Sequence, residues 1–143
     1  MPTRPRDYYE HLIDAMPAGA ERTVLRVLTF HIGLANSIQK PDLIDACAEM
    51  GTKFSDERQV RLTIVKLRKA GIPACASSGE SGYFLAATLE EYREFRGREY
   101  VKKICDMRET VTAMDASAKA MFPTEYQQYL QEKATKAGQP ALL

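Results

Sequence analysis

The side chains with the clearest chemical potential lie between Lys53 and Ala70, where the positive charge of the chain is concentrated. This stretch carries six basic and two acidic residues, a net charge of +4, whereas the formal net charge of the whole chain is only +1. Such a cluster attracts anionic partners. The chemistry that it offers is therefore binding, through the cations Lys53, Arg58, Arg61, Lys66, Arg68 and Lys69.

A helix must present these cations, and the sequence predicts one that begins near Asp56. Ser55 can accept the free N–H groups of the first turn, and the acidic Asp56 suits the positive end of the helix dipole. Val60, Ile64 and Leu67 then follow at the i, i+4, i+7 spacing of a buried stripe. The opposite, presented face is expected to carry Arg58, Gln59, Leu62, Lys66 and Lys69.

Two short extended segments are expected directly after this helix. Gly71 can take a positive φ at the helix end, and Pro73 prevents the helix from continuing. Strands are predicted over residues 72–77 and 82–86, because both contain strand-forming residues and the four residues between them have turn composition. That turn, Ser78-Gly79-Glu80-Ser81, has no Lys or Arg, and Glu80 would repel phosphate groups.

Two further helices are expected before the basic one. Apolar residues repeat with helical spacing over residues 20–34, which predicts the first core helix. Pro41 suits the first turn of a second helix that runs to Met50, with Met50 in the core, and ends at Gly51. Ile38 lies between the two helices as a lone apolar residue in a polar connection.

The first 19 residues are interpreted as a solvated tail. They contain three prolines, the basic residues Arg4 and Arg6, and a short segment, residues 8–16, that could form two turns of helix. The two arginines could reach DNA phosphates, but they stand beside acidic residues, which favours the solvated tail.

A long helix is predicted from Leu89 to about Met121, because Thr88 and Glu91 form a T-x-x-E capping box and no proline interrupts the segment. Apolar residues in it are spaced alternately four and three apart, which is typical of a heptad seam between paired helices. Methionine and alanine pack less specifically than leucine, so the seam indicates a weak coiled coil or one side of a larger helical interface. The seam comprises Tyr100, Ile104, Met107, Val111, Met114, Ala118 and Met121.

A final short helix is expected after Phe122 and Pro123, with Thr124 as its cap. Its apolar side, Tyr126, Tyr129 and Leu130, could fold back on the long helix or contact a partner chain. The sequence leaves both arrangements open.

No catalytic, metal or cofactor site is expected. Cys47, Cys75 and Cys105 lack the spacing of a zinc site, His11 and His31 are isolated, and no nucleotide-binding or protease motif occurs. No apolar run approaches the roughly 20 residues that cross a bilayer, and no apolar signal region follows the first arginines. We expect a cytoplasmic protein that is not an enzyme and has no membrane partner.

The stretch from Glu21 to Ala86 resembles the winged helix-turn-helix domains of bacterial and phage regulators, in the group that includes the amino-terminal domain of the biotin operon repressor. The phrases RQVRLTIVKLRKAGIPACAS, at 58–77, and GYFLA, at 82–86, look like the recognition helix and the two wing strands. The segment from Leu89 is similar to the dimerisation helices that often follow such domains.

The expected fold is therefore mainly α with a small β-hairpin. Its predicted parts are an N-terminal arm at 1–19, a winged helix-turn-helix domain at 20–87, a long dimerisation helix at 88–122, and a short helix and tail at 123–143.

The resemblance implies that the third helix enters the major groove of double-stranded DNA while the hairpin lies over the adjacent backbone. Arg58 suits guanine, Gln59 suits adenine, and lysines suit phosphates. Arg61 and Arg68 flank the buried stripe, so each contacts DNA or pairs with an acidic residue of the second helix. The predicted DNA-binding residues are Lys53, Ser55, Arg58, Gln59, Arg61, Leu62, Lys66 and Lys69.

Two functions follow from this interpretation. The first is a sequence-specific DNA-binding homodimer, either a transcriptional regulator or a phage-type replication or recombination accessory factor. The second is a winged helix that binds a protein partner and no DNA, which the acidic turn and the Met- and Tyr-rich seam would favour.

Overall fold

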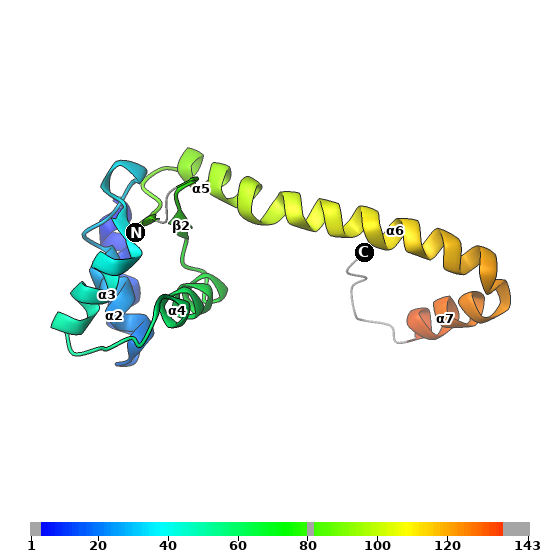
Figure 1. Cartoon of the computed structure of the whole chain (residues 1–143), viewed down its shortest axis with the longest axis horizontal. Coiled ribbons are helices and arrows are strands. Elements are labelled where there is room, and N and C mark those ends of the chain that lie inside the picture. Colours follow the sequence, from blue (N-terminus) through cyan, green and yellow to red (C-terminus); the bar gives the residue numbers. More distant parts are fainter. Residues whose placement is uncertain (1–3, 80–81, 136–143) are drawn as a thin grey trace. The chain divides into compact units, whose positions relative to one another are not determined.

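The computed structural model describes residues 4–79 and 82–135. The described chain is mainly helical with a three-stranded antiparallel sheet, which confirms the expected mainly α class with a small β element (Figure 1). It divides into two units, Met1–Arg96 and Gly97–Leu143. The first unit contains α1 (Pro5–Ala15), α2 (Ala20–Leu28), η1 (Leu34–Asn36), β1 (Ile38–Gln39), α3 (Lys40–Glu49), α4 (Glu57–Lys69), β2 (Ala74–Ala76), β3 (Gly82–Leu85) and α5 (Leu89–Arg96).

One hydrophobic core joins the first four α-helices to the sheet. The predicted stripe of α4 is confirmed, since Val60, Ile64 and Leu67 are all fully buried. They pack in the same cluster as Leu43 of α3 and Leu28 of α2. Burying a side chain of this size contributes about 1.5–3 kcal/mol. Met50, by contrast, is exposed at the end of α3, so its expected place in the core was wrong.

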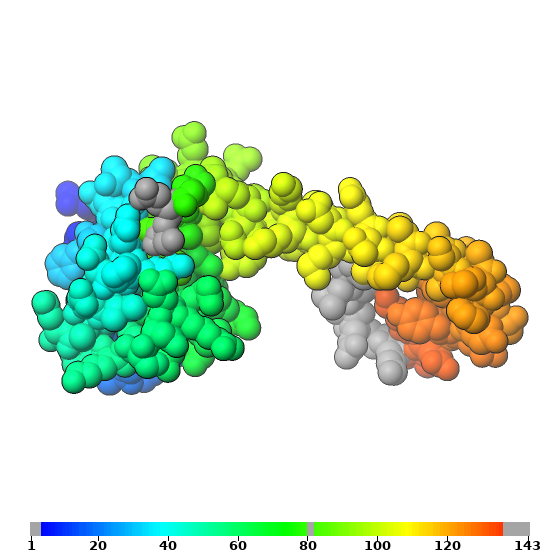
Figure 2. All heavy atoms as spheres, viewed as in Figure 1, coloured from blue at the N-terminus to red at the C-terminus, as the bar shows by residue number. Residues whose placement is uncertain are grey.

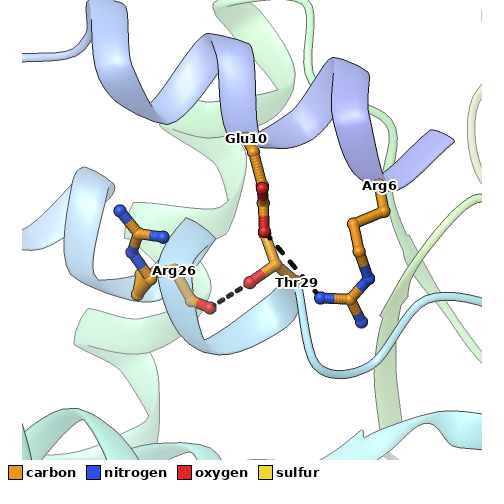
Figure 3. A network of polar contacts seen from close by, with 4 residues as sticks. All are labelled: Arg6, Glu10, Arg26 and Thr29. Carbon is orange, nitrogen blue, oxygen red and sulfur yellow. Dashed lines mark hydrogen bonds and ion pairs between the residues drawn. The ribbon is translucent and has the colours of Figure 1, made fainter. Parts of the chain in front are cut away.

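The helix predicted over residues 20–34 ends early, at Leu28. The Thr29 hydroxyl donates to the Arg26 carbonyl at 2.6 Å at this end (Figure 3). The backbone beyond it bonds to Leu85 instead: the Leu85 N–H donates to the His31 carbonyl, and the Gly33 N–H donates to the Leu85 carbonyl. Residues 31–33 are therefore extended along β3, because strand pairing competes with the helix for the same backbone groups.

The sheet has the strand order β1-β3-β2. The predicted hairpin is confirmed, with Cys75 opposite Phe84, although its strands are shorter than expected. Ile38 was expected in a polar connection, but it is buried and pairs with Tyr83 in a third strand. At Gly82 a Cβ would lie 3.1 Å from the hydroxyls of Ser37 and Ser77, so a larger residue there would require both serine side chains to shift.

Residues 5–15 form α1 within the packed unit and are not part of a solvated tail as expected. Tyr9 and Ile13 of α1 are buried in the core, and the Tyr9 hydroxyl donates to the Ala86 carbonyl at 2.8 Å. Arg6 and Glu10 of α1 form a half-exposed ion pair at 3.9 Å, and both side chains point toward Thr29 at the end of α2 (Figure 3).

The predicted capping box of α5 is confirmed, because the Glu91 N–H donates to the Thr88 hydroxyl at 3.1 Å. The Glu91 carboxylate also accepts the N–H groups of Ala87 and Leu34, each at 2.9 Å. This one side chain thus ties the start of α5 to the loop between α2 and β1.

The second unit consists of the π-helix η2 (Gly97–Val101), α6 (Lys102–Met121) and α7 (Pro123–Thr135). The single helix predicted from Leu89 to Met121 is therefore three consecutive elements. Helix α7 folds back along α6 (Figure 1), which is one of the two arrangements that the sequence left open, and Tyr129 and Leu130 stay 53% and 45% exposed. Thr124 is not its cap, because α7 already begins at Pro123, and the Tyr126 N–H donates to the Phe122 carbonyl.

Candidate nucleic-acid interface

Helix α4 begins with two side-chain hydrogen bonds to the backbone. Asp56 is its N-cap, and its carboxylate accepts the Gln59 N–H at 3.0 Å. Ser55 was expected to be the capping acceptor, but it uses its backbone N–H to donate to the Gln59 side-chain oxygen at 3.0 Å. A carboxylate outcompetes a hydroxyl here because it also interacts with the positive helix end.

The C-terminal end of α4 has the predicted glycine stop. Gly71 has φ +95°, the Gly71 N–H donates to the Arg68 carbonyl, and the Ile72 N–H donates to the Leu67 carbonyl. This is a Schellman motif, in which Ile72 and Leu67 both belong to the core. Both ends of α4 are fixed, so its outer face is held in one orientation.

All the residues predicted to bind DNA are exposed on α4 or in the loop before it. Arg58, Leu62 and Lys69 lie along the centre of the face opposite the buried stripe, and Leu62 is 50% exposed. Val65, which is partly exposed, falls on the same line and was missed. Its signal is the spacing 58, 62, 65, 69, which is the helical repeat of the exposed face.

Gln59 is less suited to base reading than its exposure indicates. Recognition of adenine by Gln uses both the amide oxygen and the amide NH2 group. The oxygen of Gln59 already accepts the Ser55 N–H, so reading a base would break a contact that holds the start of α4.

Arg68 has a structural role that distinguishes it from the other cations of α4. Its Nε donates to the Ala74 carbonyl at 2.7 Å, and its guanidinium lies 4.7 Å from the centre of the Phe95 ring. Arg68 therefore joins α4 to β2 and α5 rather than pairing with an acidic residue of α3. Arg61, its counterpart in the prediction, is exposed.

An acidic side chain from another helix reaches the edge of the basic face. The Lys66 ammonium lies 3.9 Å from the Glu21 carboxylate of α2, and the two side chains are 70% and 39% exposed. An exposed ion pair of this kind contributes about 0–1 kcal/mol. Lys66 thus stays available for another anion, at the cost of releasing a weak contact.

The charge of the first unit is divided between two regions. Residues 1–96 contain thirteen basic and thirteen acidic residues, while residues 53–70 within them carry six and two. The remainder of the unit therefore has seven basic and eleven acidic residues, a net charge of −4 against the +4 of α4 and its flanks. The net positive charge of the unit is therefore concentrated in α4 and the residues that flank it.

The turn between β2 and β3 is only partly described. Ser78 and Gly79 are exposed, whereas Glu80 and Ser81 lie outside the described residues. The expected repulsion between Glu80 and phosphate groups stays a prediction.

Other chemical groups of the described chain do not form a site. No three His, Cys, Asp or Glu side chains within residues 4–79 and 82–135 are placed to hold a metal ion. Burial raises the pKa of the Cys47 thiol to about 11, so this thiol stays protonated and is a poor nucleophile at neutral pH. No helix in the described part of the chain is long and apolar enough to cross a membrane.

The predicted seam residues lie in the second unit, and most of them are exposed. Tyr100, Ile104, Met107, Met114 and Met121 are between 40% and 67% exposed, while Val111 and Ala118 are partly buried.

None of the protein families, curated proteins or solved structures compared with this chain matches it.

Proposed function

We propose that this protein is a sequence-specific, dimeric DNA-binding protein, a transcriptional regulator or a phage-type replication or recombination accessory factor. The observation that carries the proposal is the exposed basic face of α4, which is fixed at both ends and anchored by a fully buried opposite face. The element order α2-β1-α3-α4-β2-β3 and the strand order β1-β3-β2 support a winged helix-turn-helix, in which α4 is the recognition helix.

In this proposal the exposed line of α4 lies along the floor of the major groove. Arg58 is near the N-terminal end, where recognition helices contact bases, and its guanidinium can pair with guanine. Leu62 and Val65 follow, and apolar side chains at such positions contact the methyl group of thymine. Lys69 and the flanking Lys66 contact phosphates, which position the helix without reading sequence.

The number of available cations sets how steeply the expected DNA affinity falls with salt concentration. Lys53, Arg58, Arg61, Lys66 and Lys69 are all exposed, whereas Arg68 is engaged inside the unit. If each of the five neutralises one phosphate, log K falls with log salt at a slope of about −4.5 per copy. Five phosphate contacts per copy are few for a sequence-specific binder, so doubling the contacts by dimerisation is part of the proposal.

Fluorescence anisotropy with mixed duplex fragments, titrated between low and physiological salt, tests the proposal. We expect Lys69→Ala to weaken binding to all sequences and to reduce the slope by about 0.9 per copy. Arg58→Ala should instead cost about 1–3 kcal/mol on preferred fragments and relax discrimination between them. Lys102→Ala, an exposed cation of α6, is the matched control. Absence of binding at low salt, or equal effects of the three variants, would refute the proposal.

A second candidate is a winged helix that binds an acidic protein. The observation in its favour is the apolar centre of the basic face, where the half-exposed Leu62 and the partly exposed Val65 suit a protein groove. A pull-down from nuclease-treated lysate that retains a stoichiometric protein partner, together with failed DNA titrations, would select this function over the first.

A further inference from the structure

Residues 97–135, the described part of the second unit, have no buried core of their own. Not one of the described residues 97–135 is buried, although α6 carries the apolar residues Ile104, Met107, Met114 and Met121 at 52–67% exposure. Helices are stabilised mainly by the packing of an apolar face, and contiguous exposed apolar surface marks an interaction site. The apolar line of α6 is therefore a surface that needs a cover.

We propose that a second copy of this chain provides the cover, and that the two α6 helices run antiparallel. The proposed register places Ile104 opposite Met121, Met107 opposite Ala118, and Val111 opposite Met114 of the second copy. Two-fold symmetry repeats each of these three contacts, so the two α6 helices form six apolar layers between them. The inference rests on the dimeric state in the proposed function, but it does not depend on DNA binding.

Side-chain size favours this register. A large methionine, Met107, lies against the small Ala118, so the layers keep a more even width along the seam. In a parallel, in-register pair each residue would face its own copy. Met107 would then meet Met107, and Ala118 would meet Ala118, which leaves one layer crowded and another underfilled.

Charge favours the same orientation. Arg108 and Asp115 each directly follow a seam residue, so in the antiparallel pair Arg108 of one helix lies beside Asp115 of the other, twice by symmetry. In a parallel pair Lys103 would lie beside Arg108 of the other helix, and these two positive charges repel. Lys103 already has an ion pair with Glu99 of its own chain, at 2.8 Å.

The fold of the unit is compatible with this pairing. Helix α7 lies beside the C-terminal part of α6, where burial and the neighbouring Asp115 carboxylate raise the pKa of the Tyr126 hydroxyl. A carboxylate accepts several hydrogen bonds, so Asp115 can also accept from Arg108 of the second copy. The side chains of α6, yellow in Figure 2, are uncovered along most of the helix in that view.

Disulfide trapping in the full chain, without DNA, tests the orientation. The background is Cys105→Ser, since Cys105 is exposed and Cys47 and Cys75 are buried. In it, Met107→Cys with Ala118→Cys should trap a covalent dimer. The two positions are about 16 Å apart within one helix, too far for a bridge inside one chain. Met107→Cys alone is the matched control and should stay unlinked, because its own copies are also about 16 Å apart along an antiparallel pair.

Charge reversal gives a second readout of opposite sign for the two orientations. By sedimentation equilibrium, Arg108→Asp should weaken antiparallel dimerisation tenfold or more, and adding Asp115→Arg should restore it. In a parallel pair Arg108→Asp would strengthen dimerisation by relieving repulsion from Lys103. Efficient linking of Met107→Cys alone, stronger association of Arg108→Asp, or a monomeric parent chain would overturn the inference, whatever the result of the DNA titration.

Discussion

Replacing Arg68 with alanine should destabilise the first unit, although Arg68 belongs to the basic stretch that is proposed to bind DNA. Its Nε donates to the carbonyl of Ala74, a fully buried residue, and its guanidinium stacks on the Phe95 ring. A hydrogen bond from a charged donor contributes about 1.5–3 kcal/mol. The ring contact adds about 0.5–1 kcal/mol at a partly exposed site. We therefore expect Arg68→Ala to lower the free energy of unfolding by about 2–4 kcal/mol.

Urea unfolding of the full chain, followed by far-ultraviolet circular dichroism, measures this loss. For a unit of this size each kcal/mol lowers Tm by about 4–8 °C, so a thermal scan should show a drop of roughly 8 °C or more. Arg58→Ala is the matched control on the same helix, because Arg58 is exposed and such changes stay within about 0.5 kcal/mol. Arg68→Lys should fall between them, since lysine keeps the charge but loses the planar fork.

The result that would refute this reasoning is equal stability of the Arg68→Ala and Arg58→Ala variants. If Arg68→Ala were stable and also reduced the salt slope of DNA binding, Arg68 would belong to the interface. The structural role would then be an incorrect assignment.

Three further predictions test other parts of the fold. Tyr9→Phe should lower the free energy of unfolding by about 1–2 kcal/mol because the Ala86 carbonyl loses its buried donor, while Tyr8→Phe should leave urea unfolding unchanged. Burial raises the pKa of the Cys47 thiol from 9.0 to about 11, so as pH rises the unfolded chain loses this proton before the folded chain does. The free energy of unfolding measured in urea should therefore fall between pH 9 and pH 11. The fall should be smaller in Cys47→Ala. Gly71→Ala should cost about 1–2 kcal/mol in thermal unfolding, since its φ of +95° strains any residue with a Cβ even though no atom lies within 4 Å of that Cβ. A Gly71→Ala variant as stable as the parent would contradict the last of these.

The sequence predicted best what is decided locally. The buried stripe of α4, its glycine stop and the turn after it depend on residues within a few positions of one another, so periodicity and capping rules find them. The exposed basic face followed from the same periodicity. Val65 could have been added by extending the spacing of the outer face from Arg58 through Leu62 to Lys69.

What the sequence left open depends on contacts between distant segments. A strand of two residues, such as β1, has no periodicity to detect, and Ile38 forms it only because Tyr83 and Gly82 arrive beside it. The hydrogen bond of Arg68 to Ala74 is equally invisible in a count of charges, although it removes one cation from the candidate interface. Tertiary contacts decided both.

The packing of α1 also affects how the chain folds while it is being synthesised. The Tyr9 hydroxyl bonds to the backbone of Ala86, 77 residues later in the chain. Helix α1 is made first but cannot complete its contacts until β3 has left the ribosome, so Tyr9 and Ile13 stay uncovered during most of the translation of the first unit. A nascent chain stalled before residue 86 should therefore be more sensitive to protease than one released after it.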